Sequence, residues 1–160
     1  PSPFDERLLD CDLRKVSWLI LNEVEGQQMT GCSAAEPKQI LEQLRKRYPQ
    51  AACVLTLGTA GAYYQDAHTT VFQDTFRVKS VDSTGAGDTF MGCVLNFVLD
   101  HGLDGLEEEE IRQMLRFSSA AASIITTRYG ALKVMPEQEE IQKYMKDVLT
   151  AGVKRKLKSI

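Results

Sequence analysis

The sequence predicts an α/β fold in which short buried strands alternate with helices. Two apolar runs, VSWLIL (16–21) and ACVLTLG (52–58), have the length and continuity of strands that are covered on both faces. Between them, PKQILEQLRKRYP places Ile40, Leu41 and Leu44 on one helical face, with a proline in the first turn and three basic residues at the end. A strand, a helix and a second strand in this order build a parallel sheet.

The rest of the chain predicts a smaller antiparallel part and a set of long helices. NEVEGQQMTG reads as a short helix that ends at Gly31. AYYQ, TTVFQ and DTFRVKS are short, aromatic and β-branched, which indicates an antiparallel meander. Helices are then expected from Ala86 to about Leu99, from about Leu106 to Thr126, and over PEQEEIQKYMKDVL after a TRYGALKVMP loop. We therefore expect half of a layered α/β fold, with its final helices packed together.

Composition excludes several classes of function. The 160 residues suffice for one domain with a core, and a net charge of −3 provides no basic face for nucleic acid or an anionic membrane. The four cysteines lie far apart without zinc-ligand spacing, which fits reduced thiols in a cytoplasmic protein. No signal peptide or membrane-spanning stretch is apparent. The opening PSPFDERLLD lacks an initiator Met and resembles the interior of a longer chain, so we expect a fragment.

The stretch VDSTGAGDTFMG (81–92) places a carboxylate inside a glycine-rich turn. One interpretation is structural: Ser83 or Thr84 caps the following helix, and Asp88 interacts favourably with the helix dipole. Familiar phosphate motifs match poorly, since a P-loop needs a Lys after the last glycine and a GxGxxG motif has Phe90 where its third glycine belongs.

The other interpretation of this turn is catalytic. Free N–H groups of Gly85, Ala86 and Gly87 at a helix N-terminus form an anion hole suited to charge on a transferring phosphoryl group. A carboxylate at that place repels a resting phosphate, but it can take a proton from an attacking hydroxyl. The turn therefore predicts phosphoryl transfer, with Asp88 as general base.

Four segments together resemble the ribokinase-like (PfkB) carbohydrate kinases. DSTGAGDTFMG resembles the C-terminal signature of that family, and NEVE resembles its N-x-x-E motif. TLGTAG resembles the T-L-G-x-x-G nucleotide loop, and TTRYGALKVMP the late T-R-x-G-A…P loop. The resemblance runs from Pro1 to the last helix, yet it covers only the C-terminal half of the family pattern. It implies that residues 1–160 form the nucleotide-binding and catalytic part of a three-layer α/β/α ribokinase-like domain, without the N-terminal sugar-binding part and lid.

The resemblance also implies roles for individual residues. Asp88 becomes the general base, with the amides of residues 85–87 as the anion hole. Asn22 is expected near the phosphates and Glu25 on Mg²⁺ through water, although Asn22 could simply cap a helix with Glu25 on a solvated face. The remaining nucleotide-binding candidates, of which the first three are also good turn residues, are Thr56, Gly58, Gly61 and Ser119.

Many family members bind K⁺ beside the anion hole. The matching positions here are Asp82 and Thr84, together with backbone carbonyls around Ile125, Arg128 and Gly130. Oxygen ligands suit a hard cation, and a bound charge would help to order the loop. Val134 stands where ribokinases often have a serine, which removes one ligand from the expected set.

These features predict a cytoplasmic kinase that uses ATP and Mg²⁺ to phosphorylate a ribose- or fructose-like monosaccharide. The alternative is a non-catalytic nucleotide-binding or regulatory module, against which an intact Asp88 argues. We expect these residues alone to be inactive, because the family's sugar-binding Asp and lid lie in the other half. A homodimer, if formed, is expected through that same lid.

Overall fold

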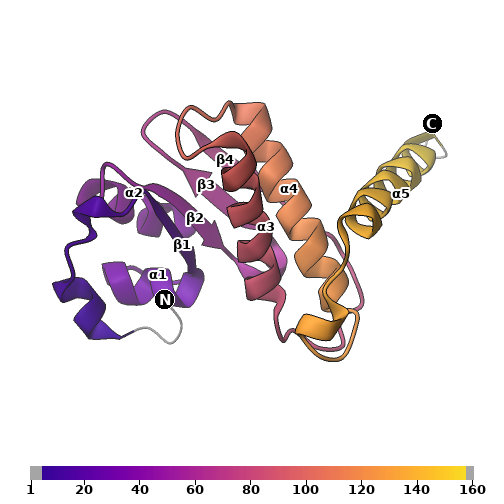
Figure 1. Cartoon of the computed structure of the whole chain (residues 1–160), viewed down its shortest axis with the longest axis horizontal. Coiled ribbons are helices and arrows are strands. Elements are labelled where there is room, and N and C mark those ends of the chain that lie inside the picture. Colours follow the sequence, from indigo (N-terminus) through magenta and orange to yellow (C-terminus); the bar gives the residue numbers. More distant parts are fainter. Residues whose placement is uncertain (1–4, 158–160) are drawn as a thin grey trace. The chain divides into compact units, whose positions relative to one another are not determined.

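The computed structural model describes residues 5–157, which form two compact units. The first contains the residues up to Asp74 together with Gly102–Arg112, and the second contains Thr75–His101 and the residues from Gln113 onward. Figure 1 shows the sheet, labelled β1 to β4, in the first unit and the helices α3 and α5 in the second.

The first unit is built on a four-stranded sheet in the order β1-β2-β3-β4. Strands β1 (Trp18–Asn22) and β2 (Ala52–Thr56) are parallel, whereas β3 (Ala62–Gln65) and β4 (Thr70–Gln73) continue the sheet as antiparallel strands. Both predicted apolar strands are therefore confirmed. Two of the three expected meander segments are also strands.

Two helices pack against one face of this sheet. They are α1 (Glu23–Thr30), which ends at Gly31 with φ 76°, and α2 (Pro37–Arg47), which has its proline in the first turn as predicted. Side chains of both helices share one apolar cluster with β1 and β2, made of Leu19, Leu21, Met29, Ile40, Leu41, Leu44, Ala51, Cys53 and Leu55. A Cβ on Gly26 would lie 2.8 Å from Ile40 Cγ2, so α1 can approach α2 this closely only because glycine has no side chain.

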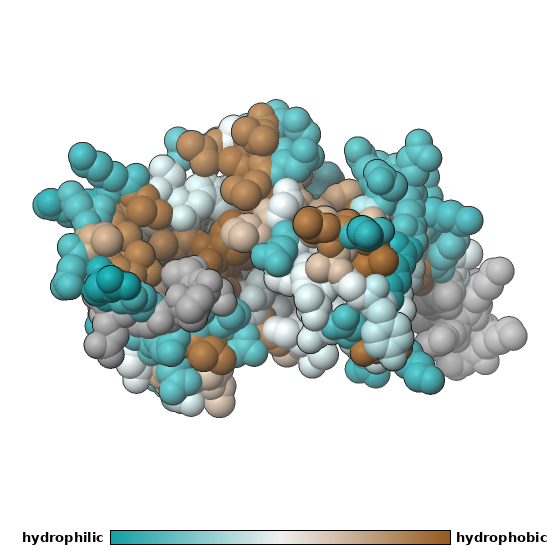
Figure 2. Space-filling view, turned by 60° about the horizontal axis from the view of Figure 1, so that its bottom comes forward, coloured by the Kyte–Doolittle hydropathy of each residue, from teal (hydrophilic) through white to brown (hydrophobic). Residues whose placement is uncertain are grey.

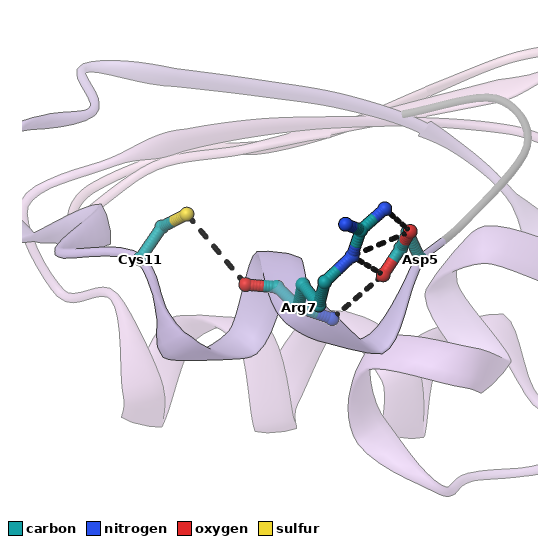
Figure 3. A network of polar contacts seen from close by, with 3 residues as sticks. All are labelled: Asp5, Arg7 and Cys11. Carbon is teal, nitrogen blue, oxygen red and sulfur yellow. Dashed lines mark hydrogen bonds and ion pairs between the residues drawn. The ribbon is translucent and has the colours of Figure 1, made fainter.

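Short 3-10 helices precede the sheet, over Glu6–Asp10 and Leu13–Lys15. Asp5 caps the first of them, because its Oδ1 accepts the Arg7 N–H at 2.9 Å (Figure 3). The Arg7 guanidinium also binds this carboxylate, and that contact holds the pKa of Asp5 below its usual range. Cys11 directly follows this 3-10 helix, and its thiol donates to the Arg7 carbonyl 3.7 Å away.

The second unit is helical. It contains α3 (Ala86–His101), most of α4 (Glu108–Ile125), a 3-10 turn over Leu132–Val134, and α5 (Gln138–Leu157). All three expected helices are confirmed, and α5 extends further than the sequence suggested. The apolar cluster of this unit contains Ala120, Ala121, Ile124 and Ile141, and Phe76 and Tyr144 pack against it.

The expectation of a third meander strand over DTFRVKS is wrong. This segment has no strand pairing and instead contacts α4. The Phe76 carbonyl accepts the Ser123 hydroxyl at 3.4 Å, and the Phe76 ring lies 5.5 Å from that of Tyr144. Its Phe76 is thus used for packing against helices of the second unit.

The surface of the described residues is mixed in polarity. Figure 2 shows apolar side chains, in brown, reaching the surface between hydrophilic ones. On α3, Met91, Leu95 and Leu99 are exposed at spacings of four residues, so one side of this helix is apolar and accessible. Among the residues described, no helix combines the length and apolar character needed to cross a bilayer. The cysteines are free, and burial raises the pKa of both Cys53 and Cys93 to about 11.

Candidate active site

The predicted site residues of the first unit lie at the carboxyl ends of its two parallel strands. Asn22 closes β1 and Thr56 closes β2, and the two are direct partners in the sheet register. The Thr56 hydroxyl donates to the Leu21 carbonyl at 3.3 Å, which ties the strand ends together. In open α/β sheets, ligands bind outside this edge. The parallel pairing therefore places Asn22 and Thr56 where a ligand would be expected.

Asn22 and Glu25 form a capping box at the start of α1. Asn22 Oδ1 accepts the Glu25 N–H at 2.8 Å, and Glu25 Oε2 accepts the Asn22 N–H at 2.9 Å. The helix-capping interpretation of Asn22 is confirmed, but Glu25 does not lie on a solvated face, since only 7% of it is exposed. One carboxylate oxygen orders the strand-to-helix turn, and the other lies outside the capping box.

The TLGTAG turn follows β2 and lies beside the start of α1. Gly58 has φ 53° and Gly61 has φ 122°, which are backbone conformations that residues other than glycine rarely adopt. Leu57 N–H donates to the Gly61 carbonyl at 2.8 Å and closes the turn. A Cβ on Gly58 would lie 3.9 Å from Glu23 Oε1. The structure thus brings together Asn22, Glu25, Thr56 and Gly58 within one unit.

Gly61 should be the least replaceable residue of this turn. A Cβ there would lie 2.2 Å from the Gln73 carbonyl oxygen, in a backbone region that is nearly exclusive to glycine. We expect Gly61→Ala to lower the free energy of unfolding by about 3 kcal/mol or more, which combines the backbone cost with the clash. Chemical denaturation of both forms measures this difference.

Gly31→Ala is the matched control for this prediction. Gly31 also has positive φ, but no atom lies within 4 Å of its Cβ position, so only the backbone cost of about 1–2 kcal/mol applies. Equal losses in the two variants would show that the close approach to Gln73 has no energetic consequence.

In the second unit, the glycine turn opens α3. Gly85, with φ 79°, directly precedes the first helical residue, so neither Ser83 nor Thr84 occupies the capping position. The expectation of free amides holds for Gly85 and Gly87, for which residues 5–157 provide no backbone acceptor. It is wrong for Ala86, whose N–H donates to the Ser83 carbonyl at 3.2 Å. Asp88 is exposed in the first turn of α3, beside the open space around Gly87.

Asp82 joins this turn to the loop that follows α4. Its Oδ1 accepts the Thr84 N–H at 2.9 Å and its Oδ2 accepts the Gly130 N–H at 3.1 Å. The Thr84 N–H, the Thr84 hydroxyl and the Gly130 N–H lower the pKa of Asp82, so its carboxylate stays charged at neutral pH. A Cβ on Gly85 would lie 3.2 Å from Ala131 Cβ. The late loop therefore packs directly on the glycine turn.

The predicted cation ligands Asp82, Thr84 and Gly130 are thus neighbours. The Ile125 carbonyl accepts the Arg128 N–H at 3.1 Å, which occupies part of its capacity as a ligand. Val134 Cγ2 lies 3.9 Å from the Cβ position of Gly130, so an apolar side chain stands in this neighbourhood. Oxygen atoms that could bind a cation are therefore present, but Val134 stands where ribokinases often have a serine ligand.

Sequence reasoning missed the part that Thr126 has in this loop. Its carbonyl accepts the N–H groups of Val81 and Asp82 at 2.8 and 3.2 Å and the Ser80 hydroxyl at 3.4 Å. Nothing in the local sequence signals a contact between backbones 45 residues apart. Ser119 is buried within α4, and its carbonyl accepts the Ser123 hydroxyl at 2.7 Å.

Comparison with known proteins identifies the family. The model of the pfkB family of carbohydrate kinases matches residues 1–138. The chain is 34% identical to fructokinase-2 of Solanum lycopersicum over 134 residues, which are 81% of this chain and 38% of the relative. It therefore spans less than half the length of the curated relatives it matches.

Solved structures agree on the fold. Arabidopsis thaliana ribokinase, complexed with ribose and ATP, matches with a TM-score of 0.71 at 28% identity, over 84% of this chain and 42% of that one. A fructokinase variant from Vibrio cholerae, bound to fructose, ADP and potassium ion, matches with a TM-score of 0.66 at 24% identity, over 79% and 40%. The fold is ribokinase-like α/β, and the chain belongs to the pfkB family of carbohydrate kinases.

Proposed function

We propose that this chain is the nucleotide-binding and catalytic part of an ATP-dependent kinase for a ribose- or fructose-like sugar. The observation that carries the proposal is the exposed Asp88 carboxylate in the first turn of α3, close in sequence to the amides of Gly85 and Gly87, which have no backbone acceptor within residues 5–157. A base and an anion-binding helix end at one place are what transfer of a phosphoryl group to a hydroxyl requires.

In the proposed mechanism, Asp88 accepts the proton of the attacking sugar hydroxyl. The Gly85 and Gly87 amides, with the N-terminal dipole of α3, stabilise negative charge on the γ-phosphoryl group during transfer. The Ala86 N–H has a partner within the turn and contributes less. A primary hydroxyl is the expected acceptor, since the two kinds of sugar named for the relatives both carry one.

The first-unit residues are assigned to the nucleotide. Asn22, Thr56, Gly58 and Gly61 would contact ATP at the strand ends, with Ser119 near the adenine. No group of three or more potential ligand side chains occurs among the described residues. Mg²⁺ keeps several waters and is usually held by one or two carboxylates and substrate phosphates, so Glu25 would hold it through water. When bound, Mg²⁺ neutralises phosphate charge.

Potassium is assigned to Asp82, Thr84 and the carbonyls of Ile125, Arg128 and Gly130. The support is the contact of Asp82 with both Thr84 and Gly130, and the potassium ion of the Vibrio cholerae fructokinase. The bound charge would hold the late loop against the glycine turn. Cytoplasmic location and dimer formation through a lid supplied by the other half of the family pattern complete the proposal.

The test is a coupled ADP-release assay over a panel of pentoses and hexoses. It uses this chain joined to the N-terminal half of a family member, in K⁺ and in a bulky organic cation. We expect turnover with at least one sugar and higher turnover in K⁺. Absence of turnover with every sugar, in a folded fusion that binds ATP, contradicts the kinase proposal. Equal turnover in both cations contradicts the potassium site and points to Val134.

A further inference from the structure

The side chain of Arg128 connects three segments of the second unit. Its Nη1 donates to the Val134 carbonyl at 3.0 Å, in the 3-10 turn after the late loop. Its Nη2 contacts the carboxylate of Glu140 in the first turn of α5. Both side chains are partly buried, at 33% and 42% exposure. One guanidinium therefore binds the end of the loop and the start of α5 together.

The residues between these contacts are those that meet the glycine turn. Gly130 N–H donates to Asp82 Oδ2, and Ala131 packs against the Cβ position of Gly85. The Arg128 backbone is itself anchored, because its N–H donates to the Ile125 carbonyl at the end of α4. The loop 128–134 is thus fixed at its first residue by α4 and at its last by the Arg128 side chain.

We infer that Arg128 and Glu140 are positioning residues, which hold the loop 128–134 so that Gly130 and Ala131 stay against Asp82 and Gly85. The geometry of the turn that precedes Asp88 then depends on α5, whose start supplies Glu140. The consequence for anion binding rests on the proposed function, whereas the ordering of the loop does not.

Two considerations separate this inference from an ordinary surface ion pair. Exposed ion pairs contribute little to global stability, so the pair is not expected to decide whether the unit folds. The Val134 carbonyl, however, gives the guanidinium a second, charge-assisted contact that fixes its orientation. In addition, Glu140 lies beyond the residues that match the family model, so the family match does not include the Arg128–Glu140 pair.

The test measures amide hydrogen exchange of the whole chain in Arg128→Gln and Glu140→Gln. We expect exchange at Gly130 and Thr84, whose amides bind Asp82, to become about tenfold faster in both variants, as loss of a contact to a charged group implies. Exchange at Val54 in the buried strand β2 should not change. Arg128→Lys keeps the charge but not the planar fork, so an intermediate rate is expected.

Arg112→Gln is the matched control. Arg112 pairs with Glu108 on α4, at 47% and 58% exposure, but its contact stays within that helix, so Gly130 exchange should keep its wild-type rate. Unchanged Gly130 exchange in the Glu140 variant, or equal acceleration in the Arg112 control, overturns the inference. The charge reversal Arg128→Glu with Glu140→Arg restores the ion pair but loses the contact with Val134, so it should not restore protection.

A second measurement separates this inference from the proposed function. Titration with ADP in K⁺ should give severalfold weaker binding in both glutamine variants. If the wild-type chain does not bind ADP while Gly130 exchange responds as expected, the nucleotide proposal fails and the positioning role stands. If ADP binds the wild type but Gly130 exchange does not respond, the positioning role fails and the nucleotide proposal stands.

Discussion

Asp88→Asn is expected to reduce kcat at least about a hundredfold in the kinase completed with its N-terminal half, while ATP binds as well as before or more tightly. General-base catalysis contributes about 10²–10⁴ in rate, and an amide cannot accept the hydroxyl proton. The same change removes a negative charge next to the amides of Gly85 and Gly87, where phosphate should bind. Coupled ADP release measures the rate, and nucleotide titration measures the affinity.

Asp100→Asn provides the control for the Asp88 variant. Asp100 is exposed near the C-terminal end of the same helix, where its carboxylate contacts Asn96 Nδ2 at 3.5 Å. Loss of charge there should leave kcat unchanged. An Asp88 variant that retains more than a tenth of the wild-type kcat would rule out the general-base role, and weaker ATP binding would show that the carboxylate does not repel phosphate.

Local patterns predicted most of the elements because each depends on neighbours in sequence. The short helix α1 follows from Asn22 and Glu25, whose spacing of three residues is that of a capping box. Helix α2 follows from a first-turn proline and an apolar face, and β2 from a continuous apolar run. In each case, the residue pattern within a short segment indicates the conformation.

The features that sequence did not reveal depend on contacts between distant segments. DTFRVKS has strand composition, but its Phe76 packs with Tyr144, 68 residues later, and it pairs with no strand. The link between Asp82 and Gly130 crosses 48 residues, and Arg128, in the loop after α4, reaches Glu140 in α5. Family resemblance predicted an anion hole formed by the amides of residues 85–87, yet only the structure shows that the Ala86 N–H donates to the Ser83 carbonyl.

These 160 residues by themselves are expected to bind a purine nucleotide weakly and to phosphorylate no sugar. The residues assigned to the nucleotide, in the first unit and in the second, lie within the described chain, so part of that site should form. The family's sugar-binding Asp and lid belong to the half that the resemblance does not cover, and this chain spans 38–44% of two of its relatives. Positioning of reactants is worth roughly 7–11 kcal/mol. Loss of half of that contribution slows transfer by a factor of about a thousand.

The comparison that tests this expectation runs the same sugar panel on the chain alone and on its fusion with an N-terminal half. Nucleotide affinity should differ modestly between the two, because all the residues assigned to ATP lie in this chain. Sugar-dependent turnover should differ by at least about a thousandfold, because the added half is expected to exclude water and to orient the sugar hydroxyl at Asp88. Sugar-dependent turnover of similar rate in both would mean that these residues orient the acceptor themselves, and the site around Asp88 would then have to contain its own sugar-binding groups.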